Sequence, residues 1–184
     1  MENNLNNDLK NKIKGLALYQ IVGGIIGIGL TIWLISKTVT ITGLLILIFI
    51  LATGLYSFSI YCGQQLLKGK IKGGLKLSTI NQSLQVINFA LLGFGFKFVA
   101  GLILSIGIDY TNDFNFTFNF SLSEFQFNIN SERELVTVGF NIVAIYLVYF
   151  IDKLQQEIEN RETLFNASQN IDTFTESSTT EVYQ

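Results

Sequence analysis

Residues 13–35 read IKGLALYQIVGGIIGIGLTIWLI, an apolar run in which Lys14 is the only charged residue. A run longer than about 18 residues with so few charges is typical of a membrane-spanning helix. It is longer than the apolar core of a signal peptide, about 7–15 residues, and no cleavage site of small residues follows it. The stretch therefore predicts a first membrane span.

The rest of the chain repeats this composition. Hydrophobic residues make up 49% of the sequence and charged residues only 14%, against about 25% in soluble domains. Further apolar blocks predict spans at about 41–62, 83–108 and 135–151. The sequence thus predicts an all-α integral membrane protein, a four-transmembrane-helix bundle whose outer loop, residues 109–134, carries a small extracytoplasmic β-hairpin.

The predicted spans divide the chain into four regions. A cytoplasmic N-terminal tail (1–12) precedes the membrane domain (13–151). A charged segment (152–165) predicts a helical extension, in which Glu157 and Arg161 can pair at i,i+4. The last region (166–184) is rich in Ser and Thr, and we expect it to be disordered.

Lysine and arginine predict the orientation, because cytoplasmic loops carry an excess of them. Nine lie before or at the start of the first span, between the second and third, or after the fourth, whereas Lys37 and Arg133 are the two on the other side. We therefore expect a multi-pass protein of the cell (plasma or inner) membrane with both termini in the cytoplasm.

Small residues cluster on one face of the first span. Gln20, Gly24, Gly27 and Thr31 share a helical stripe, with Gly23 at its margin. Glycine lets helix backbones approach closely in lipid, and polar side chains hydrogen-bond between helices. This face is therefore expected to pack against another helix.

Lys97 is the one charged residue well inside a predicted span. As a helix, the third span would place it on the same face as Ala90, Gly93 and Gly101. No acidic residue lies within any predicted span, so we expect neutral partners at matching depth, Gln20 or Asn141. Lys97 then either reaches toward the membrane surface, a structural role, or forms an anion or lipid-headgroup site.

The connector between the second and third spans is basic. Lysines beside a membrane set topology, and each also attracts anionic lipid by about 1 kcal/mol. The candidate anionic-lipid contacts are Lys68, Lys70, Lys72 and Lys76.

The outer segment alternates phenylalanine with polar residues over 114–120 and again over 125–129, which is the pattern of a strand. Pairing Phe120 with Phe125 leaves a four-residue loop and predicts a β-hairpin with one apolar face. Its other face lacks the lysines that commonly protect a sheet edge, so such an edge is open to a partner strand.

The sequence offers little reactive chemistry. It has no histidine and a single cysteine, Cys62, so we expect no enzyme, no metal site and no cofactor. A net charge of −2 gives no indication of nucleic-acid binding. The leading interpretation is a non-catalytic accessory or interaction subunit of a membrane complex, in contact with lipids and with a membrane-protein partner or further copies of itself.

Two other classes of function are less compatible with the sequence. A small oligomeric channel or transporter would use Lys97 in an anion or lipid-headgroup site. An intramembrane enzyme would lack the usual acid–base pair.

Overall fold

The computed structural model describes residues 6–111, 113–129 and 136–181; Arg133 and the outermost residues of both tails lie outside this part of the chain. The described residues form four helices and four strands, which are α1 (Asn7–Lys37), α2 (Gly43–Leu67), α3 (Ile71–Ser83), β1 (Ile87–Leu91), β2 (Phe94–Asp109), β3 (Asn115–Ile129), β4 (Thr137–Asn141) and α4 (Ile142–Glu181).

The prediction of an all-α four-helix membrane bundle is wrong. Residues 83–108, predicted as the third span, contain the end of α3 and then β1 and nearly all of β2. Within the predicted fourth span, residues 137–141 form strand β4, and a helix starts only at Ile142. Among the described residues, two helices are long and apolar enough to cross a membrane, α1 and α2.

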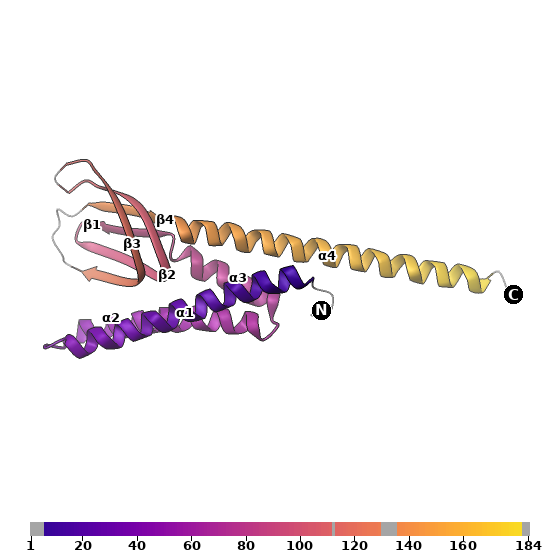
Figure 1. Cartoon of the computed structure of the whole chain (residues 1–184), viewed down its shortest axis with the longest axis horizontal. Coiled ribbons are helices and arrows are strands. Elements are labelled where there is room, and N and C mark those ends of the chain that lie inside the picture. The colour runs from indigo at the N-terminus through magenta and orange to yellow at the C-terminus, as the bar shows by residue number, and fades with distance from the viewer. Residues whose placement is uncertain (1–5, 112, 130–135, 182–184) are drawn as a thin grey trace.

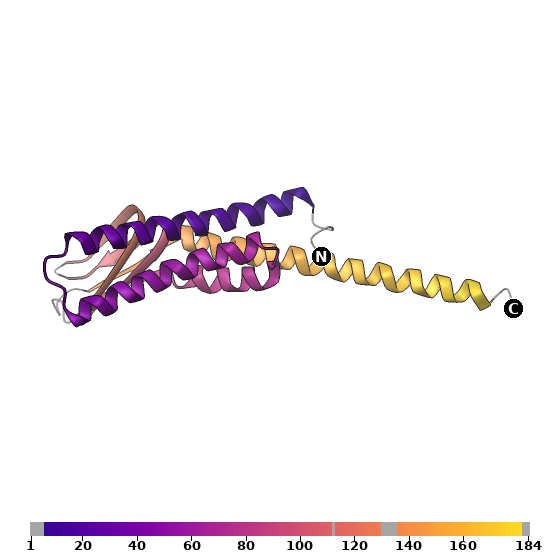
Figure 2. The same cartoon turned by 90° about the horizontal axis from the view of Figure 1, so that it is seen from below.

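Helices α1 and α2 form an antiparallel hairpin that lies beside the sheet at one end and beside α3 and the start of α4 at the other (Figures 1 and 2). Gly24 and Gly27 of the predicted stripe face α2, whereas Gly23 faces the backbone of strand β2 and not a helix. A Cβ on Gly24 would lie 2.7 Å from the Tyr56 carbonyl oxygen, and one on Gly27 would overlap the Tyr56 ring. The absence of side chains at these positions thus permits the close approach of the two helices.

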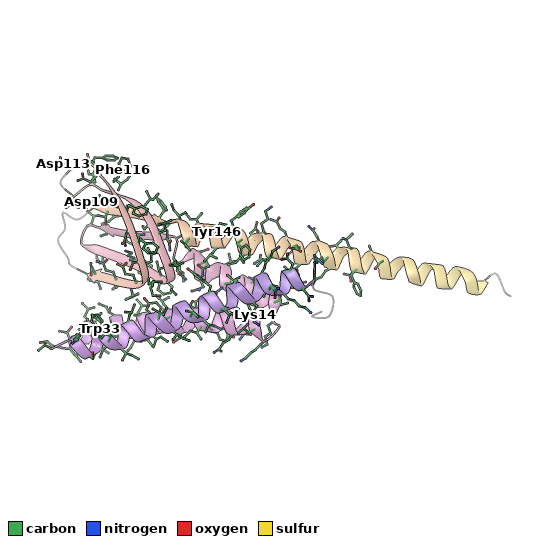
Figure 3. All side chains as sticks on the ribbon, viewed as in Figure 1. Lys14, Trp33, Asp109, Asp113, Phe116 and Tyr146 are labelled. Carbon is green, nitrogen blue, oxygen red and sulfur yellow. The ribbon has the colours of Figure 1, made fainter. Side chains whose placement is uncertain are left out.

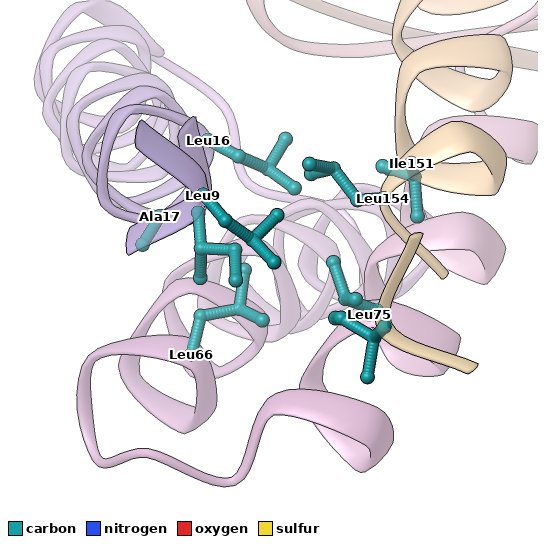
Figure 4. Packing of buried hydrophobic residues seen from close by; sticks show 9 residues of the cluster. Leu9, Leu16, Ala17, Leu66, Leu75, Ile151 and Leu154 are labelled. Carbon is teal, nitrogen blue, oxygen red and sulfur yellow. The ribbon is translucent and has the colours of Figure 1, made fainter. Parts of the chain in front are cut away.

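At the end of the hairpin that holds the N-terminus, all four helices share an apolar core (Figure 4). Helix α3 turns back along α2, and α4 returns past α3 and α1. The buried side chains that meet here include Leu9, Leu16, Ala17, Leu66, Leu75, Ile151 and Leu154. Burial of this cluster fixes where α4 leaves the other three helices.

The four strands lie beside the other half of the hairpin (Figure 1). Strands β1 and β2 are joined by a two-residue turn at Leu92 and Gly93, both with positive φ. That conformation matches the twist of adjacent strands, although it is rare for leucine. Along its whole length β2 pairs antiparallel with β3, and the sheet order is β1-β4-β2-β3 with an additional pairing between β1 and β2.

Strand β2 must bend because of these pairings. Its first residues pair with β1, its last residues, from Ser105 to Asp109, pair with β4, and β1 and β4 also pair with each other. Three straight strands cannot each be antiparallel to the other two. The change of direction falls at Ala100 and Gly101, where the register with β3 shifts and Gly101 has φ +121°.

The predicted hairpin within residues 114–129 is also wrong. This segment is one continuous strand, β3, which places Phe120 opposite Leu104 and Phe125 opposite Phe98 of β2. The alternating pattern does form a strand, but its partner is the apolar segment that precedes it, not its own second half.

Helix α4 continues through Glu181, across residues for which the sequence predicts disorder. It extends far beyond the other elements (Figures 1 and 2). The predicted pair within it is confirmed, because Arg161 Nη2 lies 2.9 Å from Glu157 Oε1.

The contact of α1 with the bend in β2 gives a first prediction. A Cβ on Gly23 would lie 2.6 Å from the carbonyl carbon and oxygen of Ala100, which are backbone atoms that cannot move aside. We expect Gly23→Ala to destabilise the fold by about 1–3 kcal/mol, measured as a lower thermal midpoint in detergent.

Gly29→Ala is the matched control, since nothing lies within 4 Å of a Cβ at this position of the same helix. It should leave the midpoint unchanged or raise it slightly, because alanine favours helix. Equal midpoints for Gly23→Ala and Gly29→Ala would contradict the contact between α1 and β2.

Candidate functional site

The polar interior of the protein centres on the bend in β2. There two residues of β2 oppose Ser123 alone, so the backbone N–H groups cannot all bond to a neighbouring strand. Three side chains accept from these groups instead. The Ala100 N–H donates to Gln85 Oε1 (2.8 Å), the Gly101 N–H to Ser123 Oγ (3.0 Å) and the Leu102 N–H to Tyr19 OH (3.0 Å).

These acceptors connect the bend to three other elements. Tyr19 belongs to α1, Gln85 follows α3, and Ser123 belongs to β3. The Ser123 hydroxyl in turn donates to the Gly23 carbonyl oxygen at 3.0 Å. A buried N–H without a partner costs about 1–3 kcal/mol, so each of these bonds matters to the position of the sheet on the hairpin.

A second polar group lies between α1, α2 and α3, and all of its side chains are buried. Ser59 Oγ donates to the Gln20 carbonyl oxygen at 3.1 Å, and Ser78 Oγ donates to Gln20 Oε1 at 3.3 Å. Asn81 Nδ2 donates to Ser59 Oγ at 3.2 Å, and the Asn81 carbonyl oxygen accepts from Gln85 Nε2. The hydrogen-bonded chain therefore runs from α1 to the bend in β2.

Four buried amide side chains hold atoms without a hydrogen-bond partner in the described part of the chain. Buried polar atoms almost always have such partners, so these are the atoms best suited to hold a small polar group. Amides carry both donors and acceptors but stay neutral, so they can bind a neutral group without moving a proton. The atoms are Gln20 Nε2, Asn81 Oδ1, Gln82 Nε2, Gln82 Oε1 and Asn141 Nδ2.

Lys97 has an acidic partner, contrary to the expectation that only neutral groups could reach it. Its Nζ lies 2.8 Å from Glu124 Oε2, and the exposed fractions of the two side chains are 14% and 34%. Lys97 pairs with Gln126 across the sheet and Val99 with Glu124, so the two charges are diagonal neighbours on one face. The outer segment supplies the carboxylate because it folds back beside β2.

The predicted companions of Lys97 lie in other networks. Gln20 belongs to the second buried polar group, which lies between α1, α2 and α3. Asn141 Oδ1 accepts from the Leu104 N–H at 3.3 Å and from the Val143 N–H at 3.2 Å, so it attaches the start of α4 to β2. Lys97, Gln20 and Asn141 therefore do not form one site, because each bonds to different groups.

The small residues predicted to share a helix face with Lys97 lie on strands and a turn. Ala90 is in β1, Gly93 is in the β1–β2 turn and Gly101 is at the bend. A helical stripe of these residues is therefore wrong.

The connector lysines lie at the end of the hairpin opposite the α1–α2 turn. Lys68 follows the last residue of α2, Lys70 precedes α3, and Lys72 and Lys76 are on α3. Lys72 Nζ lies 2.5 Å from Glu162 Oε2 of α4. Contact of the lysines with anionic lipid stays a prediction, and for Lys72 it would compete with Glu162.

Asp109, at the tip of the β2–β3 hairpin, has a carboxyl group whose pKa is lowered by its hydrogen bonds. The Thr111 side chain and backbone N–H, the latter at 2.9 Å, favour the charged form and lower the pKa of Asp109. Within the described residues, no group of three or more His, Cys, Asp or Glu side chains could hold a metal ion.

No known protein family, curated protein or solved structure matches this chain.

Sequence reasoning missed Tyr19, Gln85, Ser123 and Glu124. A signal for Gln85 was present, because residues 78–85 read STINQSLQ, too polar for lipid yet placed at the start of a predicted span. Tyr19, Ser123 and Glu124 gave no such signal, since their roles depend on β3 folding back beside β2.

The Lys97–Glu124 pair gives a second prediction. Lys97→Met leaves the Glu124 carboxylate without its cation and should destabilise the protein by about 2 kcal/mol, less than a fully buried pair because Glu124 remains partly exposed. Adding Glu124→Gln should recover most of the loss, because no charge is then unpaired. The thermal midpoints of both variants in detergent test this.

Glu159→Gln, an exposed carboxylate on α4, is the matched control for removing an acid. If the Lys97→Met, Glu124→Gln double variant is as unstable as the sum of its two single variants, the two side chains do not interact.

Proposed function

We propose that this protein is a non-catalytic accessory or interaction subunit of a membrane complex, anchored by the α1–α2 hairpin and presenting α4 to a partner. The observation that carries the proposal is the apolar surface of the hairpin combined with a long, polar helix that leaves it. The apolar surface is suited to a membrane, and the long polar helix is suited to a binding partner.

The free face of the hairpin is apolar along most of its length. In water, so large an apolar patch marks an interface with a membrane or another protein. The exposed side chains on it include Leu18, Val22, Ile25, Ile32, Trp33, Leu34, Ile46, Leu47, Ile50 and Leu51. A hydrocarbon environment is the covering that suits side chains along two apolar helices at once.

Residues at the two ends of this surface agree with the depth of a bilayer. Lys14 lies at one end and Trp33 near the other, as Figure 3 shows. The distance between them along α1 is about 28 Å at 1.5 Å per residue, close to the hydrocarbon thickness of about 30 Å. Trp at one boundary and Lys beyond the other are typical of interface residues.

The lysine distribution supports an orientation for a two-span hairpin in the cell membrane. Lys10, Lys12 and Lys14 lie in the first turns of α1 and four lysines lie between residues 68 and 76, whereas Lys37 is alone at the α1–α2 turn. The side with more lysines would be cytoplasmic, so both termini would lie in the cytoplasm.

Helix α4 beyond Asp152 is the part suited to a protein partner. It is largely polar, and Leu164 and Phe165 are exposed apolar side chains on it, 71% and 47% respectively. A long helix with few packing contacts gains little stability from propensity alone, so a partner would stabilise it.

The described side chains favour this function over a channel for anions. Lys97 was the one residue that argued for an anion site, and Glu124 already balances its charge. The remaining buried polar groups are neutral amides and hydroxyls.

Cysteine labelling tests the anchoring and the orientation. In a Cys62→Ser background, Val39→Cys should react with an impermeant thiol reagent in intact cells, because Val39 is 99% exposed at the α1–α2 turn. Gly69→Cys and Ser168→Cys should react only after permeabilisation. Labelling of Gly69→Cys from outside would reverse the orientation, and extraction of the protein from membranes by alkaline carbonate would contradict the anchor.

Purification tests the accessory role. From native membranes in mild detergent, the protein should come with another protein at fixed stoichiometry. Replacing Leu164 and Phe165 with Asn should release that protein, whereas Asn160→Ala, an exposed control on α4, should retain it. Anion flux through liposomes that contain this chain alone would contradict the proposal.

A further inference from the structure

The sheet turns its apolar side outward. In the second half of β2, Ile103, Ser105 and Gly107 are buried, whereas Leu102, Ile106 and Ile108 are exposed. On the buried side, Asn88 Nδ2 donates to Ser105 Oγ at 3.0 Å. A sheet of a soluble domain has the opposite arrangement, with polar residues facing water.

Strand β3 enlarges this outer face. Phe116, Phe118 and Phe120 lie opposite Ile108, Ile106 and Leu104 of β2, and the exposed fractions of the three phenylalanines are 77%, 68% and 68%. Phe116 lies at the outermost part of the sheet, at the same end of the molecule as Trp33 (Figure 3).

This part of the sheet lies at the depth of the apolar helices. The bend in β2 contacts Gly23, about 21 Å along α1 from Lys37 at 1.5 Å per residue. Asp109 and Asp113, at the tip of the β2–β3 hairpin, lie near the level of Trp33 (Figure 3). On the orientation proposed above, the strands between these levels cross the outer half of the bilayer.

A strand at that depth needs a partner on both sides. In the described part of the chain β3 pairs with β2 and with no other strand. Lipid acyl chains cover phenylalanine well but cannot bond to backbone N–H and C=O groups, and open sheet edges are not found against hydrocarbon. The outer face of β3 can therefore face lipid, whereas its edge cannot.

We propose that the edge of β3 pairs antiparallel with β3 of a second copy of this chain, about a twofold axis at Phe118. Residues 114–122 contain no charge and no proline, so nothing protects the edge from pairing. The arrangement would join two four-stranded sheets into one.

The sequence of β3 is complementary to itself in this register. Phe118 meets Phe118, Phe116 meets Phe120, and Phe114 meets Leu122, all on the outer face. On the other face Thr117 meets Asn119 and Asn115 meets Ser121. Moving the axis to Asn119 would place Phe114 against Glu124, so the axis at Phe118 keeps the uncharged segment centred.

The proposal goes beyond the proposed function, which labelling and purification test separately. Its test is disulfide trapping in membranes, using the full-length chain with Cys62→Ser and an added oxidant. Phe118→Cys places two cysteines directly opposite, with Cα atoms about 4.5–5.5 Å apart, which a disulfide can bridge. We expect most of this variant to run as a covalent dimer.

Ile106→Cys is the matched control, because Ile106 faces the same way and lies beside Phe118 on β2. Across two paired sheets the copies of Ile106 are three strand spacings apart, about 14 Å, too far for a disulfide. It should remain monomeric.

Register is tested by co-expressing Phe116→Cys and Phe120→Cys in chains with different tags. The mixed dimer should dominate over both self-dimers, and this result does not depend on Phe118. Monomers throughout would show that β3 does not pair with its copy, and equal trapping at Phe118 and Ile106 would indicate random collision. Either result would overturn the proposal.

Discussion

The fold depends on three backbone N–H groups at the bend of β2. A strand that pairs with β1 at one end and β4 at the other has to change direction, which takes Ala100 and Gly101 out of the regular ladder and leaves the N–H groups of residues 100 to 102 to side-chain acceptors. Gln85, Ser123 and Tyr19 supply the missing acceptors. Because these side chains come from α1, β3 and the segment after α3, the same bonds hold the sheet against the helical hairpin. Gly23 completes the contact, since only a residue without a side chain lets α1 approach so closely.

This arrangement explains where polarity lies in the molecule. Hydroxyl and amide groups are gathered inside, around the bend and between the helices, and apolar side chains face outward on both the hairpin and the sheet. Such a distribution suits hydrocarbon surroundings, in which burying polar groups with partners lowers the free energy. The Lys97–Glu124 pair follows the same rule, because each charge is balanced locally.

The sequence was sufficient to predict the two apolar helices, the close packing of Gly24 and Gly27 in α1, and the Glu157–Arg161 pair. It failed at residues 83–108, because a continuous apolar run is compatible with a helix or a buried strand, and length favoured the helix. A period of two is nevertheless present, since Leu102, Leu104, Ile106 and Ile108 alternate with smaller or polar residues except at Ile103. The bonds at the bend join residues up to 100 positions apart, so no local pattern could indicate them.

The central claim is that residues 102–108 form a strand at membrane depth with its apolar side toward lipid. Spin labels placed singly on cysteines at these positions, in a Cys62→Ser chain in liposomes, report collision with dissolved oxygen, which is concentrated in hydrocarbon. The account predicts a period of two, with high oxygen accessibility at Leu102, Leu104, Ile106 and Ile108 and low accessibility at Ile103, Ser105 and Gly107. A period of about 3.6 residues would indicate a transmembrane helix and would contradict the account.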